Sequence, residues 1–172
     1  MLGIRIYGQG HFNDYFDHIF SSTEDYYWIV SKYGFYIHHD NDDIESELVD
    51  EFDKGIVLEN NENILVDNKF MKKYSSFLRN DWNELVCLRN GRKHFEEISN
   101  VMMSELWLSS EPEQTFWKYN THAIKKGWGI EFIVYNWDGS FWEFIDCNGS
   151  YSQTLINKIN TLPGVAIEEV SH

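Results

Sequence analysis

The sequence predicts a single α+β domain over residues 1–172, with a mostly antiparallel sheet. Two observations lead to this fold class. First, 42% of the 172 residues are hydrophobic and 17% are aromatic, so apolar material for one core is plentiful. Second, strand-like and helix-like segments follow one another without the regular strand–helix–strand units of a parallel sheet. We therefore expect several helices to pack against a sheet built around a central hairpin.

The clearest local pattern is that hairpin, over about 130–146. Two apolar runs flank the tetrapeptide Trp-Asp-Gly-Ser, and its Asp-Gly pair favours a tight two-residue turn because both positions need positive φ. This turn places Tyr135 opposite Trp142 and Val134 opposite Glu143. Because both faces of the two runs are largely apolar, the hairpin is expected in the middle of the sheet.

The remaining elements follow from shorter patterns. Runs of β-branched and aromatic residues predict strands, and apolar residues three or four positions apart predict helices. The strands are expected at 4–7, 26–30, 35–38, 64–66 and 165–167. The helices are expected at about 41–55, 68–78, 92–106, 110–127 and 151–161. The aromatic segment 12–20 has no clear period and carries no prediction.

Negative charge is concentrated in one segment. Residues 40–67 contain eleven acidic residues and one lysine, a formal −10 of the chain's net −14. The next segment, 68–93, is the reverse, with seven basic and two acidic residues. An acidic surface attracts cations or a basic partner, and it disfavours nucleic acid and anionic membranes as direct ligands. The two segments could also pair with each other inside the molecule.

The acidic segment carries the pattern of an amphipathic helix. Asn41 can cap its start and Gly55 its end, and Ile44, Leu48 and Phe52 recur every four residues along one face. The acidic side chains of the other faces are candidates for contacts with a cationic partner; they are Asp42, Asp43, Glu47, Asp50, Glu51 and Asp53. The alternative is a solvated helix face that only keeps the chain dispersed.

Tryptophan is crowded into one third of the chain, at positions 107, 117, 128, 137 and 142. Most of these side chains are expected in the core. Trp137, at the predicted hairpin tip, is the one expected to be exposed, where it could anchor a partner. The same aromatic third could instead line the pocket of a small-molecule-binding domain or an enzyme.

Catalytic and metal-binding motifs do not occur in the sequence, which has no P-loop, no G-x-S-x-G and no H-E-x-x-H. His38 and His39 precede a run of aspartates, but neighbouring strand residues point to opposite faces and cannot grip one ion without a bend. Glu131, Glu143 and Asp146 could act as acid–base pairs, yet carboxylates are too frequent here to be informative. We expect no enzymatic activity, no metal and no cofactor.

The two cysteines, Cys87 and Cys147, are far apart and form no C-x-x-C motif. Such lone thiols are typical of reduced cysteines in a cytoplasmic protein, with a disulfide as the less favoured alternative. Cys147 follows an apolar strand, but without a nucleophile motif a core thiol is favoured over a catalytic one. The first residues lack a signal-peptide pattern and no apolar run reaches about 18 residues, so we expect a cytoplasmic chain without a membrane span.

The overall profile resembles the immunity proteins that protect bacteria from polymorphic or contact-dependent growth-inhibition toxins. The resemblance rests on the acidic segment 40–53 and on an aromatic α+β remainder without catalytic motifs. It implies a stoichiometric inhibitor that binds one cognate basic toxin, in many cases a nuclease, either over its active site or at another site. A DNA-mimic regulator is a further alternative: it uses acidic residues in place of phosphates and binds several DNA-binding proteins.

Overall fold

The computed structural model describes residues 2–7, 12–20, 25–38, 46–79, 83–89, 91–106, 127–137, 141–147, 149 and 152–171. In these residues five helices pack against eight strands, which is the predicted α+β fold. The helices are α1 (Phe12–Ile19), α2 (Ser46–Lys54), α3 (Asn68–Tyr74), α4 (Phe95–Leu106) and α6 (Ser152–Ile159). The strands are β1 (Leu2–Tyr7), β2 (Tyr27–Ser31), β3 (Leu58–Glu59), β4 (Asn63–Asp67), β5 (Asn83–Leu88), β6 (Ile130–Trp137), β7 (Phe141–Asp146) and β8 (Ala166–Ser171).

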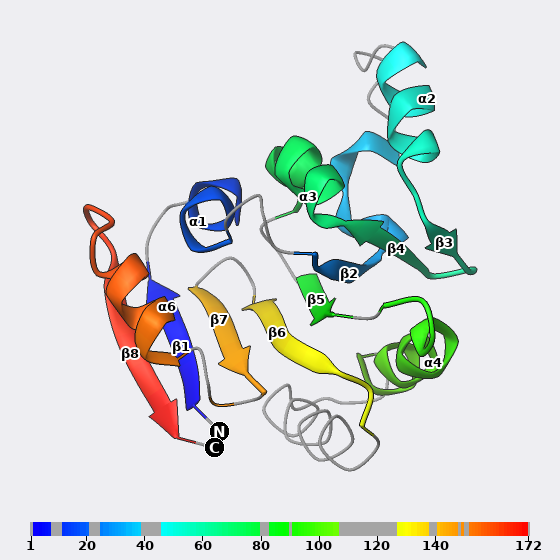
Figure 1. Cartoon of the computed structure of the whole chain (residues 1–172). Coiled ribbons are helices and arrows are strands. Elements are labelled where there is room, and N and C mark those ends of the chain that lie inside the picture. Colours follow the sequence, from blue (N-terminus) through cyan, green and yellow to red (C-terminus); the bar gives the residue numbers. More distant parts are fainter. Residues whose placement is uncertain are drawn as a thin grey trace.

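The eight described strands form one sheet in the order β3-β4-β2-β5-β6-β7-β1-β8, and every pairing is antiparallel. The predicted hairpin corresponds to β6 and β7. It lies inside the sheet between β5 and β1, so its expected central position is confirmed (Figure 1). The short β3 and the longer β8 form the two edges.

The register of this hairpin differs by one residue from the predicted one. Trp137 pairs with Phe141, so three residues rather than two separate the paired ends of the strands. Tyr135 therefore lies opposite Glu143 and not opposite Trp142. The Asp-Gly signal located the turn correctly along the chain, but the turn is one residue longer than the type I′ hairpin that it favours.

Side-chain packing explains the observed register. A shift of one residue turns every side chain of a strand to the other face of the sheet. In the structure Val134 faces Phe144 rather than Glu143, and both apolar side chains belong to one core. Ile133 faces Ile145, and this pair belongs to the core on the opposite face. The longer turn thus matches apolar residues on both sides of the sheet.

The predicted strand that begins at Phe35 is wrong. Phe35 forms one isolated bridge with Leu78, and a 3₁₀ helix follows at Tyr36–His38. The chain has already turned just before, in a 3₁₀ helix at Lys32–Gly34. The Phe35 ring is fully buried, with its centroid 5.1 Å from that of Phe52. The aromatic residues that suggested a strand here serve core packing instead.

Most other predicted elements are confirmed with small changes at their ends. The helix expected after Asp67 is α3, and Oδ1 of Asp67 accepts a hydrogen bond from the Phe70 backbone N–H at 2.8 Å. The other segments that match their predictions are β1, β2, β4, β8, α4 and α6. The predicted helix at 110–127 lies almost entirely outside the described residues, as does the predicted start of the acidic helix at 41–45.

Apolar residues form two cores, one on each face of the sheet. The first core lies under α1, α3 and α6 and contains an aromatic cluster that includes Phe12, Phe16 and Trp28 (Figure 1). The second core lies under α4, which contributes Phe95 and Ile98. Within the described part of the chain, no helix has the length and apolar composition needed to cross a bilayer.

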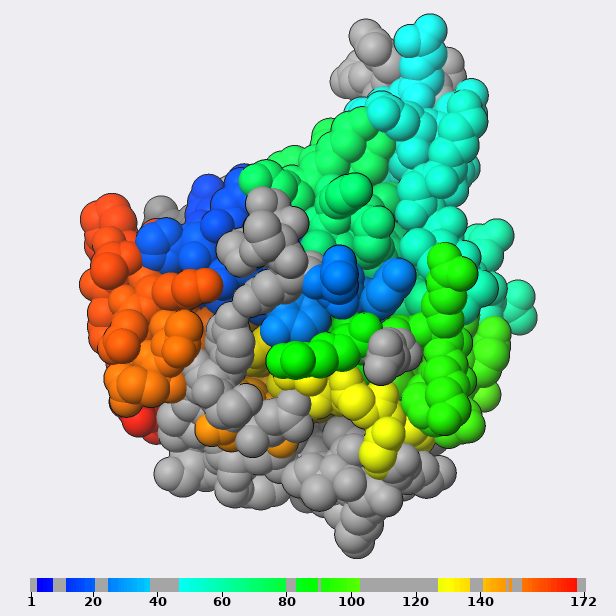
Figure 2. Space-filling model, viewed as in Figure 1, coloured from blue at the N-terminus to red at the C-terminus, as the bar shows by residue number. Residues whose placement is uncertain are grey.

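Helix α2 projects from the body of the molecule at one end of the sheet (Figures 1 and 2). Its anchor is Phe52, which is fully buried. The Phe52 ring centroid lies 4.7 Å from that of Phe70 and 5.1 Å from those of Phe35 and Tyr74. Edge-to-face contacts between aromatic rings, like these three, stabilise packing beyond the area they bury. One apolar face therefore fixes α2, and its other faces point to solvent.

Candidate functional site

The acidic residues of α2 point in three directions. Successive helix residues are about 100° apart, which places Glu47 and Asp50 on the side opposite the anchor Phe52. Glu51 and Asp53 flank the apolar face, one on each side. All four acidic side chains are exposed, whereas Phe52 is buried. Glu47 and Asp50 thus form an outward-facing acidic ridge, the outer ridge of α2. Glu51 and Asp53 lie on either side of it.

Glu51 is used within the molecule. Its Oε1 atom lies 2.5 Å from Nζ of Lys73 on α3. This hydrogen bond raises the pKa of Lys73. The predicted possibility that the basic segment pairs with the acidic one therefore holds at this position. Because both side chains are exposed, the ion pair contributes little to stability, but it turns Glu51 toward α3.

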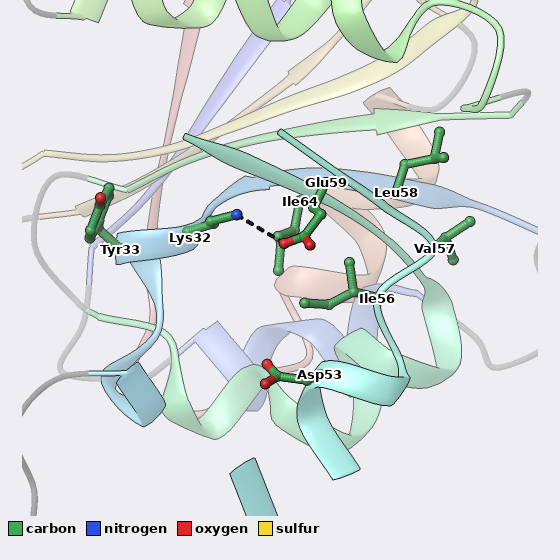
Figure 3. A pocket seen from close by; sticks show the side chains of 8 residues that line it. All are labelled: Lys32, Tyr33, Asp53, Ile56, Val57, Leu58, Glu59 and Ile64. Atoms are coloured by element: carbon green, nitrogen blue, oxygen red, sulfur yellow. Dashed lines mark ion pairs between the residues drawn. The ribbon is translucent and has the colours of Figure 1, made fainter. Parts of the chain in front are cut away.

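Asp53 borders an open hollow of about 740 Å³ on the other side of α2 (Figure 3). Three parts of the chain form its walls: the turn after β2, the end of α2 with the segment that follows it, and strands β3 and β4. The lining residues are Lys32, Tyr33, Asp53, Ile56, Val57, Leu58, Glu59 and Ile64. Of these, the sequence predicts a functional role for Asp53 alone.

The charged residues of the hollow come from separate elements. Nζ of Lys32 lies 2.9 Å from Oε2 of Glu59, and Figure 3 shows this ion pair on the opposite side of the hollow from Asp53. The backbone N–H of Lys32 donates to the Glu62 carbonyl at 2.8 Å, which ties the turn after β2 to the start of β4. With Asp53 included, the lining carries two carboxylates and one amine, a formal charge of −1.

Aliphatic and aromatic side chains supply the rest of the lining. Ile64 is 1% exposed, and Ile56 and Val57 are half-buried. Tyr33 and Leu58 are 55% and 37% exposed. Single exposed apolar residues are ordinary on a protein surface, and two of them lie beside this hollow. The hollow thus combines apolar walls with a few charged groups.

Gly55 explains how the chain passes from α2 into the wall of the hollow. A Cβ atom at this position would lie 2.6 Å from Cδ2 of the Phe70 ring, which is too close for any side chain. The Gly55 backbone N–H donates to the Phe52 carbonyl at 3.0 Å, and that of Ile56 donates to the Asp53 carbonyl at 3.2 Å. These bonds satisfy the last carbonyls of the helix and close it beside the hollow.

Three further predicted site residues remain, Asp42, Asp43 and Trp137. Asp42 and Asp43 lie outside the described residues. Trp137 ends β6, which is four positions from β3 in the order of the sheet. Neighbouring strands are about 4.8 Å apart, so these two strands are separated by roughly 19 Å. The side chain of Trp137 lies outside the described part, and its strand is not adjacent to the hollow.

The carboxylates that the sequence leaves open as acid–base groups are held by structural contacts. Glu143 is 4% exposed, and its Oε2 atom lies 2.9 Å from Nε of Arg5. Glu131 is 7% exposed, and its Oε1 atom lies 2.8 Å from Nε of Arg89. Oδ1 of the buried Asp146 accepts a hydrogen bond from a backbone N–H of the segment after β7 at 2.9 Å. These contacts join neighbouring strands and their ends.

The cysteines are poor nucleophiles in this environment. Burial, together with the negative charges of Asp146 and Glu131, raises the pKa of the Cys147 thiol to about 12. Such a thiol stays protonated at neutral pH, whereas the thiolate is the nucleophile. Cys87 lies fully buried on β5, and both cysteines are thiols in this structure.

Metal ligands do not gather in the part of the chain that the structure describes: no group of three or more His, Cys, Asp or Glu side chains there could hold an ion. The side chains of His38 and His39 lie outside that part. Comparison with known proteins adds no relative, since no protein-family model, no curated protein and no solved structure matches the chain. Function therefore has to be inferred from the site itself.

Proposed function

We propose that this chain is an immunity protein that acts in the cytoplasm and neutralises a cognate cationic protein toxin, with a nuclease as the favoured toxin class. The observation that carries the proposal is the projecting helix α2, which presents Glu47 and Asp50 outward while Phe52 holds it to the core. A nuclease presents basic residues to its anionic substrate, and an acidic helix complements them. Covering those residues excludes nucleic acid.

The acidic ridge acts mainly on the rate and orientation of association. Exposed carboxylates steer a basic partner over long range, but each contributes little affinity. Affinity in such complexes comes from a desolvated centre that holds an anchor side chain. The hollow bordered by Asp53, with Tyr33 and Leu58 exposed beside it, supplies such a centre next to α2.

The test is inhibition of an identified toxin. The chain serves as bait in a lysate of the source cell, and one retained basic protein is identified by mass spectrometry. Its nuclease activity is then measured on DNA and RNA with increasing amounts of the chain. We expect activity to disappear near a one-to-one ratio. A retained protein that keeps its full activity in a molar excess of the chain contradicts the proposal.

A small-molecule-binding domain is the second candidate, and the size of the hollow favours it. Its volume of about 740 Å³ falls within the range of roughly 300–1,000 Å³ that is typical of ligand sites. The hollow lies between α2 and β3, not in the aromatic last third of the chain. Thermal denaturation with a metabolite library tests this candidate, because a ligand that binds the folded state raises the melting temperature without any protein partner.

A further inference from the structure

Strand β8 forms an open edge of the sheet. It pairs with β1 at six consecutive positions, from Ala166 opposite Tyr7 to Ser171 opposite Leu2, and no described strand lies on its other side. Figure 1 shows β8 as the outermost strand beside β1. In a strand, successive residues direct their backbone N–H and C=O groups to alternate sides. Every second residue of β8 therefore presents a donor and an acceptor to a further strand.

The two edges of the sheet differ in length and in protection. Edge strand β3 has only two residues, and a very short strand is one way in which proteins prevent pairing at an edge. β8 has six residues, contains no proline or lysine, and pairs with β1 without a bulge. Three of its residues, Ala166, Glu168 and Glu169, are exposed. Of the two edges, β8 is thus the one with the length to accept a partner strand.

A second copy of the chain is a poor partner for this edge. Antiparallel pairing of β8 with another β8 over five or six residues places Glu168 opposite Glu168, Glu169 opposite Glu169, or one of them opposite the other. Like charges directly opposite each other destabilise a pair of strands. The two glutamates therefore oppose self-association and favour a strand that carries positive charge.

The exposed Glu168 ends a row of alternating charge across three strands. Glu143 on β7 lies opposite Arg5 on β1, which lies opposite Glu168 on β8, so the three side chains share one face of the sheet. Nε of Arg5 lies 2.9 Å from the buried carboxylate of Glu143, whereas its Nη1 atom lies 3.8 Å from Oε2 of Glu168. The Tyr7 hydroxyl donates a hydrogen bond to the same Glu168 oxygen at 2.5 Å, and that side chain remains 51% exposed. A cation on a strand added beside β8 would continue the row.

Glu169 carries negative charge on the opposite face of the same strand. It lies opposite Ile4, a residue of the first core, and its side chain is exposed. Ile167 shares this face and packs against the same core. An added strand would therefore meet a carboxylate on each face and an apolar side chain beside Glu169.

The surroundings of β8 do not balance its two glutamates. The described residues of β7, β1, β8 and the adjacent helix α6 carry four carboxylates and two cations, a formal −2. The cations are Arg5, which Glu143 already holds, and Lys158, whose Nζ atom donates to the Ile19 carbonyl on α1 at 2.6 Å. A basic strand is therefore the charge-complementary occupant of this edge.

We infer that β8 accepts an extended basic segment of a protein partner as a further antiparallel strand. Two adjacent basic residues of that segment face Glu168 and Glu169, one on each face of the sheet, and an apolar β-branched residue follows opposite Ile167. Backbone hydrogen bonds hold the added strand, and these three side chains set its register. The site is separate from the proposed toxin contact, because β8 and the β3 edge beside α2 are at opposite ends of the sheet.

The test uses the folded chain and short peptides. Acetyl-Thr-Lys-Arg-Val-Thr-amide is titrated into the isotope-labelled protein, and the peptide with Glu-Glu in place of Lys-Arg is the control. We expect the basic peptide to shift amide resonances of β8 and β1, with a dissociation constant on the order of 1 mM, and the acidic peptide to shift none of them. Equal shifts with both peptides, or shifts confined to another surface, overturn the inference.

Two N-methylated peptides distinguish strand addition from contact between charges alone. Each carries one backbone methyl group, on the lysine or on the arginine. Because neighbouring residues of a strand direct their N–H groups to opposite sides, only one of the two methyl groups blocks a hydrogen bond with β8. We expect that peptide to bind at least about fivefold more weakly and the other to bind within about twofold of the unmethylated one. Equal effects of the two methyl groups contradict strand addition.

Two matched variants separate β8 from the overall negative charge of the chain. Glu169→Gln removes one charge from the edge strand, and Asp50→Asn removes the same charge from the outer ridge of α2. We expect Glu169→Gln to weaken binding of the basic peptide about threefold and Asp50→Asn to change it by less than about 1.5-fold. Equal effects of the two variants contradict a contact at β8. Resonances of β8 that shift when the free chain is concentrated would assign this edge to a second copy and also overturn the inference.

Discussion

Carboxylates are exposed to solvent in one region of the molecule and are buried and ion-paired in another. On α2, Glu47 and Asp50 project into solvent from a helix that stands out from the body. On strands β6 and β7, Glu131 and Glu143 are no more than 7% exposed, and each is bonded to an arginine. All four are carboxylates, so residue type alone does not separate groups that bind a partner from groups that stabilise the fold. Their surroundings do.

The difference has a physical basis that decides what each group can do. A buried charge is costly unless it is paired, so removal of one partner damages the fold. An exposed charge costs little and remains available to another molecule. We therefore expect substitutions of the carboxylates on β6 and β7 to lower folding stability, and substitutions of the carboxylates on α2 to weaken partner binding. The following predictions test this division, from the largest expected effect to the smallest.

Cys147, beside the buried carboxylates, should be almost unreactive in the folded chain. With its pKa raised to about 12 by burial and by Asp146 and Glu131, its thiolate fraction at pH 8 is about a thousandfold below that of a thiol at the ordinary value of 9.0. Iodoacetamide labelling of a Cys87→Ala variant, folded and in urea, measures this ratio. A labelling rate in the folded chain close to that in urea would contradict the raised pKa of Cys147 and make this residue a candidate nucleophile.

The same shift makes stability depend on alkaline pH. The pKa of Cys147 is higher in the folded state than in the unfolded state. The protonated thiol therefore makes its full contribution to folding stability below about pH 9, and this contribution is lost as the pH rises toward 12. Replacing Cys147 with alanine should make stability less sensitive to pH in this window. Urea unfolding of the unaltered chain and of Cys147→Ala is compared at pH 8 and pH 10. If both lose the same free energy of unfolding between these pH values, Cys147 is not the group responsible.

Glu143→Gln should destabilise the fold by about 2–3 kcal/mol, because it leaves the Arg5 guanidinium without its buried carboxylate. Glu168→Gln is the matched control, since its carboxylate lies 3.8 Å from the same arginine but is 51% exposed. We expect the control to cost less than about 1 kcal/mol. Urea denaturation gives both changes in the free energy of unfolding. Similar changes for the two variants would show that burial of the Glu143 carboxylate does not set the cost of losing its ion pair.

Asp50→Lys should slow association with the captured toxin by about tenfold at low salt, with a smaller effect at high salt, because steering by exposed charge is screened. Glu169→Lys makes the same charge change on β8, at the opposite edge of the sheet from β3, and should leave the rate nearly unchanged. Stopped-flow mixing measures both rates. Equal slowing would assign the effect to net charge rather than to α2.

Glu51→Gln should have the smallest effect. Its carboxylate pairs with Lys73 at 2.5 Å, and both side chains are exposed, so we expect no measurable change in the urea midpoint. Its effect on toxin association should also be weaker than that of Asp50→Asn, because part of its charge is already balanced. The two rates can be measured side by side, and a larger effect of Glu51→Gln would place the docking face toward α3.

The fold was predictable where a local sequence pattern is compatible with only one secondary structure. The apolar runs of β6 and β7, and the Asp67 cap of α3, fix those elements by local chemistry. Strand β5 carries no sequence prediction because all six of its residues are buried, so it lacks the alternation of a half-exposed strand. The hairpin register depends on matching apolar pairs across two cores, which the turn sequence does not encode.

The site was predictable only in part, for a similar reason. The acidic helix follows from spacing along one segment, but the direction of each carboxylate depends on what α2 packs against. Contact with α3 turns Glu51 toward Lys73, and the turn after β2 brings Lys32 and Tyr33 beside Asp53. The hollow joins residues of several separate segments, and no pattern in any one of them marks it.

The measurement that tests the central claim most directly is paired capture from source-cell lysate at moderate salt. One bait is the unaltered chain, and the other carries Glu47→Lys and Asp50→Lys, which reverse the outer ridge of α2 without touching Phe52. We predict that the unaltered chain retains one basic protein in stoichiometric amount and that the variant loses it. Retention of the same protein by both baits, or of none by the unaltered chain, would contradict a docking role for α2.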